Sequence, residues 1–154
     1  MKKTNAVRTL DKMNVDYSLV EYNAGNDVSA AAVAERIGIP LGQIYKTLVV
    51  RGDKTGIIIA SVPGDRELDL KALAKVSGNK KIEMVALEEI KPLTGYVRGA
   101  VSPFGMKKVY KYYLDRSILQ YEKIYVSAGA WGLQIFLPSE SLIETTKAFV
   151  ANIC

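Results

Sequence analysis

The sequence predicts an α/β fold of the α+β kind, in which helices flank a mixed, curved β-sheet or barrel-like core. Short β-branched and aromatic runs are interspersed with helical segments. Two pairs of these runs are separated by turn residues, as in antiparallel hairpins. The regular strand–helix–strand order of a doubly wound sheet is absent. No repeat or linker divides the chain, so we expect one domain over residues 1–154.

The first elements are predicted from capping residues and periodicity. Thr4 can cap an opening helix whose apolar residues recur at helical spacing. Residues 17–22 (YSLVEY) alternate like a half-buried strand. Ser29 can cap a second helix, SAAAVAERIG, which Gly38 ends.

The clearest hairpin follows. Residues 45–50 and 56–62 are β-branched runs on either side of the turn-rich RGDKT. Residues 69–78 predict a helix with an aspartate cap and a glycine stop, and residues 80–85 predict a strand. A short helix, ALEEIKPL, is expected to end at Pro92.

The last third of the chain predicts a loop, a strand, a hairpin and a helix. Residues 94–108 are rich in glycine and polar groups and indicate a loop, before a strand around residues 107–115. Residues 122–129 and 132–137 predict a second hairpin. Residues 138–153 are expected to form a closing helix that opens at Pro138 or Ser139.

The composition limits the chemistry that the chain can perform. It contains no histidine, and its one cysteine is Cys154. These counts rule out Ser-His-Asp and Cys-His catalysis and leave no imidazole to act as a general base or metal ligand. We therefore expect no metal site and no cofactor. An enzyme of this composition must use carboxylates, lysine, hydroxyls and backbone amides, or the reactivity of its substrate.

Composition also indicates the compartment and the class of partner. No apolar run is long enough for a transmembrane helix, the first residues lack the apolar stretch of a secretory signal, and one cysteine excludes an intramolecular disulfide. We expect a cytoplasmic protein that does not bind membranes. Twenty-one basic and sixteen acidic residues give a net charge of +5. That excess fits an anionic partner, and it fits a merely basic surface equally well.

Three features are candidates for chemistry, each with a plainer alternative. Lys46 lies within an apolar strand run: it is either an outward-facing strand lysine, which physics alone favours, or a cation that holds a phosphate or carbonyl oxygen. Residues 95–105 contain three glycines that can present backbone amides to an anion, or they form an ordinary surface loop. The turn at residues 127–129 (SAG) either forms the base of a narrow pocket or is simply the corner of a hairpin.

Six segments occur in a fixed order between about Lys3 and Leu142: KTNAVRTLD, YKTLVVRG, ELDLKALAKVSGNKKIEM, TGYVRGAVSPFGMKK, IYVSAG and GLQI. Together they resemble the YbaK/EbsC family, relatives of the editing domain inserted in bacterial prolyl-tRNA synthetases. The resemblance implies a barrel-like mixed sheet flanked by helices, with aminoacyl-tRNA as the substrate. The TGY-x-x-G-x-x-SP-x-G-x-KK pattern is more similar to the branch that hydrolyses Cys-tRNA(Pro) than to the branch that hydrolyses Ala-tRNA(Pro).

The resemblance also implies roles for individual residues. Lys46 matches the functional lysine of the family, which reverses the preference stated above. The implied catalytic residues are Lys46, Gly99 and Ser127, and the implied substrate-binding residues are Tyr22, Ser102, Gly129 and Gln134.

The chain departs from the family pattern at three places, which leaves its substrate preference open. Ala100 replaces a second glycine that is usual there. Ala130 and Trp131 replace a commonly basic pair, which either weakens a phosphate contact or substitutes stacking. Gln134 stands where some members carry aspartate near the amino group of the substrate.

The resulting hypothesis is a trans-editing hydrolase for mischarged Cys-tRNA(Pro). Cysteine is close in size to proline, so selection by size alone yields only about 1–3 kcal/mol. The substrate thiol is expected to attack its own ester, while Lys46 holds the terminal adenosine and amides around Gly99 and Ser127 stabilise the oxyanion. The expected partners are the 3′ acceptor end of aminoacyl-tRNA and prolyl-tRNA synthetase, with no DNA. Two alternatives stay open: a water-based deacylase of Ala-tRNA(Pro) or another small aminoacyl-tRNA, and a non-catalytic module that binds tRNA or the synthetase.

Overall fold

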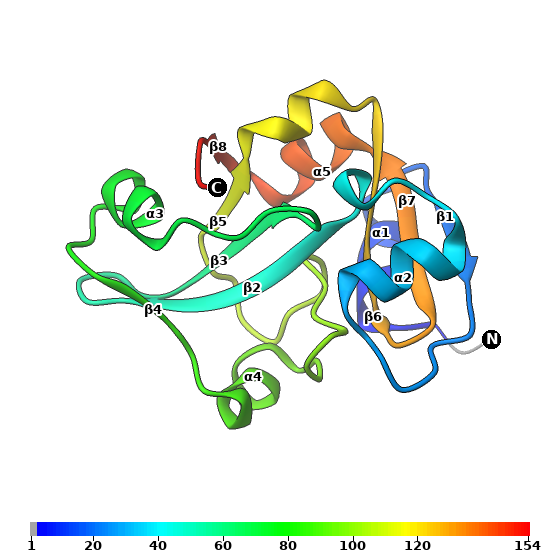
Figure 1. The fold of residues 1–154 in the computed structure, drawn as a ribbon, viewed down its shortest axis with the longest axis horizontal. Helices are drawn as coiled ribbons and strands as arrows, with labels where there is room; N and C mark the ends of the chain where they lie inside the picture. The colour runs from blue at the N-terminus through cyan, green and yellow to red at the C-terminus, as the bar shows by residue number, and fades with distance from the viewer. Residues whose placement is uncertain (1–2) are drawn as a thin grey trace.

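The computed structural model describes residues 3–154 as two β-sheets with helices packed around them (Figure 1). One sheet has three strands in the order β1-β7-β6, and the other has five in the order β4-β2-β3-β5-β8. The strands are β1 (Ser18–Glu21), β2 (Tyr45–Gly52), β3 (Gly56–Pro63), β4 (Ile82–Met84), β5 (Tyr112–Asp115), β6 (Lys123–Ala130), β7 (Leu133–Pro138) and β8 (Phe149–Ala151). The helices are α1 (Asn5–Lys12), α2 (Ala30–Ile37), α3 (Leu70–Ser77), α4 (Leu87–Thr94) and α5 (Ser139–Thr146), with short 3-10 helices η1 (Leu41–Gln43) and η2 (Arg116–Gln120).

Both predicted hairpins are present. β2 and β3 pair without interruption from Tyr45 opposite Pro63 to Gly52 opposite Gly56. β6 and β7 pair across a register shift between Ser127 and Ala130. The larger sheet is mixed, because β3, β5 and β8 run parallel while β2 and β4 pair antiparallel. The prediction of a mixed α+β fold is therefore confirmed.

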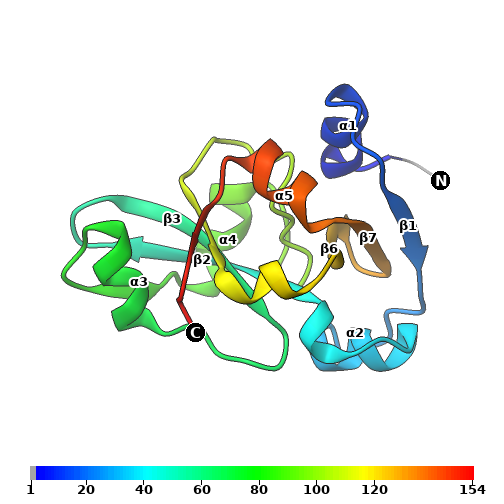
Figure 2. The same ribbon diagram turned by 90° about the horizontal axis from the view of Figure 1, so that it is seen from above.

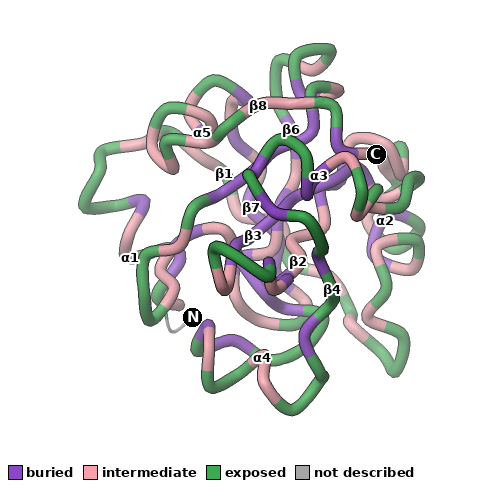
Figure 3. Tube along the Cα trace, turned by 90° about the vertical axis from the view of Figure 1, so that its left-hand side faces the viewer, coloured by how far each residue is buried: buried purple, intermediate pink, exposed green. Residues whose placement is uncertain are grey.

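The two sheets meet where β2 begins. Ile44, the residue before β2, forms a parallel bridge with Tyr125 of β6. Both faces of the larger sheet are covered, since Val49 packs in one apolar cluster and its neighbour Val50 in another. Figure 3 shows the buried residues concentrated along these central strands, whereas α4 lies at the surface.

Helix caps form as the sequence predicts. The side chains of Thr4, Ser29 and Asp69 accept hydrogen bonds from the backbone N–H groups that open α1, α2 and α3. Gly38 and Gly78 end α2 and α3 in the left-handed conformation. Figure 2 shows α1 and α2 on opposite sides of the small sheet, with β1 running between them.

Two expectations about helix ends are wrong. Pro92 lies inside α4, which continues to Thr94 and is closed by the left-handed Gly95. A proline there removes only the hydrogen bond to the Glu88 carbonyl, and Glu88 is exposed to water, which can replace it.

The closing segment is not one helix. α5 ends at Thr146, and the next residue, Lys147, has a left-handed φ of 55° that closes the helix. The aromatic and β-branched residues that follow form β8, parallel to the edge of β5. Asp115 of β5 secures this end, because its Oδ1 accepts a hydrogen bond of 3.0 Å from the backbone N–H of Ile153.

The strand expected around residues 107–115 is shorter than predicted, since β5 covers only Tyr112–Asp115. Within residues 3–154, no helix combines the length and the apolar character that crossing a bilayer requires.

Candidate functional site

A cavity of about 320 Å³ lies where the two sheets meet. Its walls come from the approach to α2, the first half of β2, the loop that follows α4, and the β6–β7 hairpin. Four of the residues expected in the site line it together: Lys46, Gly99, Ser127 and Gln134. Residues separated by more than eighty positions in the chain therefore share one cavity.

Lys46 is held on β2 with its side chain only 24% exposed. Its Nζ lies 3.4 Å from Oε1 of Glu67, and the Glu67 side chain is 94% exposed. An ion pair with so exposed a partner is weak and easily exchanged. Lys46 also lines a neighbouring cavity of about 250 Å³, to which Glu67 belongs. The lysine therefore borders two cavities, and its weak ion pair leaves the charge available to an anionic ligand.

The edge of β2 beside Lys46 also faces the cavity. β4 covers the further part of this edge, where the Val49 carbonyl accepts a hydrogen bond of 3.4 Å from the Val85 N–H. Antiparallel pairing sends the backbone groups of every second residue to the same edge. The N–H and C=O of Thr47 therefore point toward the cavity that Thr47 lines, where they can bind a ligand as donor and acceptor.

Ser127 and Gln134 stand directly opposite each other in the β6–β7 register, so their side chains share one face. Gln134 is only 5% exposed, and its Oε1 is buried without a hydrogen-bond partner in the structure. An unpaired buried acceptor is costly unless a ligand or water satisfies it. Ser127 Oγ accepts a hydrogen bond of 3.1 Å from the Gly129 N–H, which leaves its own hydroxyl proton to donate.

Gly99 occupies a position that only glycine fits. Its φ is +81°, and a Cβ there would lie 2.5 Å from Cγ2 of Val28 and 3.3 Å from Nε1 of Trp131. The Trp131 Nε1–H donates a hydrogen bond of 2.9 Å to the carbonyl of Arg98, the residue before Gly99. The backbone at Gly99 is therefore fixed from both sides at the cavity wall.

Three expected site residues lie outside this cavity lining. Tyr22 lines a neighbouring cavity together with Trp131. Ser102 is fully buried, and its Oγ accepts a hydrogen bond of 3.3 Å from the Phe104 N–H, so it shapes the loop from within. Gly129 forms the bulge behind Ser127.

Gly129→Ala is expected to lower the free energy of unfolding by more than the strain of an alanine in a left-handed conformation accounts for. The φ of Gly129 is +92°, and an added Cβ would lie 2.6 Å from Cε1 of the buried Tyr96. Gly38→Ala is a matched control, because Gly38 has a φ of +82° with nothing within 4 Å of its Cβ position.

Both substitutions carry the left-handed backbone penalty of about 1–2 kcal/mol, and Gly129→Ala adds an overpacking cost of about 1–3 kcal/mol. Urea unfolding of the two variants measures the difference. Equal losses of stability would show that Tyr96 moves aside without cost.

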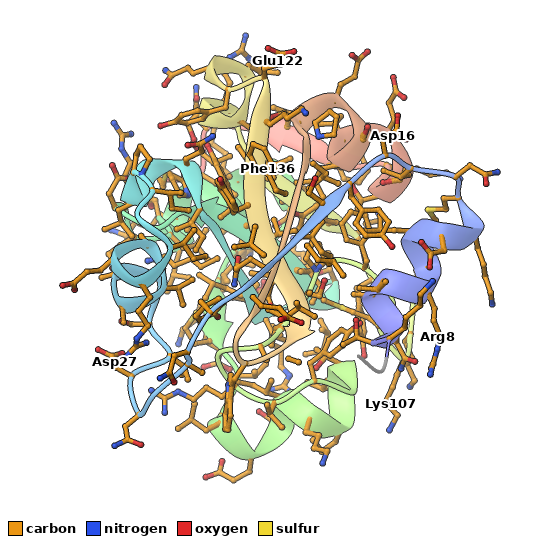
Figure 4. All side chains as sticks on the ribbon, turned by 90° about the vertical axis from the view of Figure 1, so that its right-hand side faces the viewer. Arg8, Asp16, Asp27, Lys107, Glu122 and Phe136 are labelled. Atoms are coloured by element: carbon orange, nitrogen blue, oxygen red, sulfur yellow. The ribbon has the colours of Figure 1, made fainter. Side chains whose placement is uncertain are left out.

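Two charged lining residues were not among the residues expected in the site. Arg98 is exposed at the rim and precedes Gly99 within the glycine-rich loop, so the loop itself was a signal for it. Asp27 lies on the segment that enters α2 (Figure 4). The backbone hydrogen bond from Ser29, followed by the Ser29 side chain, lowers the pKa of Asp27, which therefore stays ionised. The rim carries one fixed charge of each sign.

The cavity offers a cation, a buried amide, hydroxyl groups and backbone groups, but no cysteine and no histidine that could activate a hydroxyl. The chain has no histidine, and Cys154 lines a different cavity. Burial, and then the neighbouring Asp115, raises the pKa of the Cys154 thiol to about 11. That thiol is protonated near neutral pH. The lining is suited to binding and polarising a small ester or amide that itself carries the reacting group.

Comparison with known proteins gives one consistent relationship. A family model described as an aminoacyl-tRNA editing domain matches residues 26–145. The chain is 48% identical over 99% of its length to EbsC of Enterococcus faecalis, a protein described as a candidate Cys-tRNA(Pro)/Cys-tRNA(Cys) deacylase, and it covers 93% of that protein.

Two further matches span nearly the whole chain. The multifunctional Ser/Thr-tRNA deacylase ProXp-y of Escherichia coli is 25% identical, over 95% of this chain and 89% of its own. A crystal structure described as a candidate trans-editing enzyme for prolyl-tRNA synthetase superposes with a TM-score of 0.86 at 28% identity, and the match covers 99% of this chain and 98% of that one.

Proposed function

This chain belongs to the family of aminoacyl-tRNA editing domains, and from that premise we propose that it is a hydrolase that deacylates mischarged Cys-tRNA(Pro) in trans. The name of the EbsC relative supports cysteine as the amino acid. The description of the structural neighbour supports an editing role beside prolyl-tRNA synthetase. The reaction cleaves the ester that joins the amino acid to the terminal adenosine of tRNA.

One observation carries the proposal: Gln134 Oε1 is a buried, unpaired acceptor in a cavity whose lining contains no histidine and no cysteine. The α-ammonium group of an aminoacyl ester can donate to that oxygen. Because Gln134 is neutral, the interaction orients the ammonium group without forming an ion pair. The amino acid is then anchored while its side chain and ester are left to react.

The nucleophile is the thiol of the substrate. Its sulfur attacks the ester carbonyl, a carbon–sulfur bond forms and the carbon–oxygen bond to the ribose breaks. The thiol proton passes to the departing ribose oxygen, and the products are tRNA and a cyclic thioester that water later opens. A well-oriented intramolecular attack lowers the barrier by about 7–11 kcal/mol, so no protein nucleophile is needed.

The protein groups position the substrate and stabilise charge. Lys46 holds the phosphate or ribose region of the terminal adenosine. Backbone amides at Gly99 and the hydroxyl of Ser127 face the carbonyl oxygen as it becomes negative, and each such donor typically contributes about 2.7–4 kcal/mol. The fixed backbone at Gly99 means that these donors need no rearrangement during the reaction.

The expected partners follow from this reaction. The protein binds the 3′ acceptor end of aminoacyl-tRNA, and prolyl-tRNA synthetase is the enzyme whose errors it corrects. Because aminoacyl-tRNA is made and used where translation takes place, we expect the protein to act in the cytoplasm.

Gln134→Leu tests the anchoring role. The substitution keeps the approximate size of the side chain and removes its acceptor, so kcat/KM for Cys-tRNA(Pro) is expected to fall about tenfold to a hundredfold. Release of the amino acid from labelled Cys-tRNA(Pro) measures the effect. Gln120→Leu is the matched control, because Gln120 is exposed on η2 and lines a different cavity.

Unchanged activity of Gln134→Leu would remove the anchor from the mechanism. A wild-type protein that binds Cys-tRNA(Pro) without cleaving it would instead favour the non-catalytic binding module.

A further inference from the structure

A second cavity, of about 450 Å³, lies at the end of β1 beside the β6–β7 turn, and two of its lining residues are Tyr22 and Trp131. We propose that it binds a nucleobase of the single-stranded tRNA acceptor end, next to the esterified adenosine, by stacking on Trp131. This inference rests on the proposed function, because the terminal adenosine must enter the Lys46 cavity for the neighbouring nucleotide to lie beside Trp131.

The exposed part of Trp131 is the surface that stacking requires. The residue is 55% exposed, although a large aromatic side chain is normally more buried. Its only polar group, the Nε1–H, is already used in the 2.9 Å hydrogen bond to Arg98. The described residues form two ring stacks, Tyr113 with Phe149 and Tyr125 with Phe136, and neither involves Tyr22 or Trp131. The indole ring is therefore oriented and still open to a base.

The two aromatic residues are held next to each other by the backbone. The Tyr22 N–H donates a hydrogen bond of 3.0 Å to the carbonyl of Gly132, the residue after Trp131. Gly132 has a φ of +84°, and a Cβ there would lie 2.9 Å from the Tyr22 carbonyl oxygen, so the turn packs tightly on the end of β1. Figure 4 views the side on which β1 crosses in front of β6 and β7. A base can bind to this surface without first ordering it.

One hydrogen bond joins the linings of the two cavities. Arg98 and Gly99 line the Lys46 cavity, and the Arg98 carbonyl accepts the hydrogen bond from Trp131, which lines the second one. Adjacent nucleotides are joined by a single phosphate, so their two binding sites must adjoin. The exposed Arg98 lies between Trp131 and the Lys46 cavity through this hydrogen bond, and its side chain can neutralise that phosphate. Aromatic rings bind bases of any sequence, which suits an acceptor end that all tRNAs have in common.

Intrinsic fluorescence tests the proposal directly, because Trp131 is the only tryptophan in the chain. Titration with the trinucleotide CCA, the sequence at the 3′ end of tRNA, without an attached amino acid is expected to quench the emission to a saturating level. A trinucleotide of the same charge with abasic middle and 5′ positions is expected to bind without that quenching. Equal quenching by both ligands, or binding of CCA with no change in emission, would overturn the proposal.

Steady-state deacylation of Cys-tRNA(Pro) separates stacking from the hydrogen bond to Arg98. Trp131→Ala removes both: loss of stacking is expected to raise KM about tenfold to a hundredfold, and loss of the hydrogen bond that holds the backbone next to Gly99 is expected to lower kcat. Trp131→Phe keeps an aromatic face and loses the N–H, so its KM is expected to stay within about threefold of wild type. Phe149→Ala is the control, because Phe149 is an aromatic residue of similar exposure, 51%, on the distant β8.

An increase in KM as large in Trp131→Phe as in Trp131→Ala would show that the hydrogen bond, and not stacking, determines the affinity for the tRNA. The two proposals fail differently. Quenching by CCA together with absent deacylation would refute the catalytic function and leave the base site standing. Normal deacylation with no quenching would refute only the base site.

Discussion

Cys-tRNA(Pro) is expected to lose its amino acid about a hundredfold or more faster than Ser-tRNA(Pro) in the presence of this protein. Cysteine and serine differ by a single atom, so the cavity beside Lys46 binds both esters in the same way. A thiol is a much better nucleophile than a hydroxyl near neutral pH, and only the attacking atom differs between the substrates. Because both amino acids are attached to the same tRNA, a comparison of kcat for the cysteinyl and seryl esters measures the effect of the nucleophile separately from tRNA recognition.

Ala-tRNA(Pro) is the control in this comparison, because alanine brings no nucleophile. We expect its deacylation to stay near the uncatalysed rate. Rapid hydrolysis of alanine and serine esters would contradict the thiol mechanism and favour an activated water, in keeping with the Ser/Thr specificity in the name of the ProXp-y relative. The family assignment would survive that result, and the mechanism proposed for cysteine would not.

Lys46→Ala is expected to lower kcat/KM for Cys-tRNA(Pro) about tenfold to a hundredfold, mainly through KM. The confined ammonium group binds the nucleotide in both the ground state and the transition state, and a charged hydrogen bond is typically worth about 1.5–3 kcal/mol. The slope of log KM against log salt concentration should also fall by about 0.7, the contribution of one phosphate contact in single-stranded nucleic acid. Deacylation rates at several salt concentrations measure both effects.

Lys54→Ala is the matched control, since Lys54 is exposed in the turn between β2 and β3. Glu67→Gln removes only the 3.4 Å ion pair and should leave KM unchanged or lower it. A Lys46→Ala variant with unchanged salt dependence and reduced kcat would place the ammonium group at the carbonyl oxygen instead of the phosphate.

The parts of the fold that local chemistry specifies were predictable. Caps at Thr4, Ser29 and Asp69 and the β2–β3 hairpin depend on neighbouring residues alone. β8 was not predictable, because it forms by pairing with an edge of β5 more than thirty positions away. Its short run of residues carries no periodicity that would separate it from the preceding helix.

Four of the seven residues expected in the site line one cavity, but the sequence does not indicate how they come together. The alternation of strands places Ser127 and Gln134 on one face of a hairpin, but nothing local brings Lys46 from the other sheet to meet them. The position of Tyr22 beside Trp131 depends on the pairing of β1 with β7, which the hydrogen bond from the Tyr22 N–H to the Gly132 carbonyl continues. The residues between these strands give no local signal for that pairing.

The bridge between Ile44 and Tyr125 bears on selectivity. Lys46 belongs to the five-stranded sheet, whereas Ser127 and Gln134 belong to the three-stranded one. The width of the cavity therefore depends on how the two sheets meet, as well as on the side chains that line it. Ile44 is 3% exposed at this junction and does not line the cavity, so a change in its volume would act on the cavity through the position of the sheets.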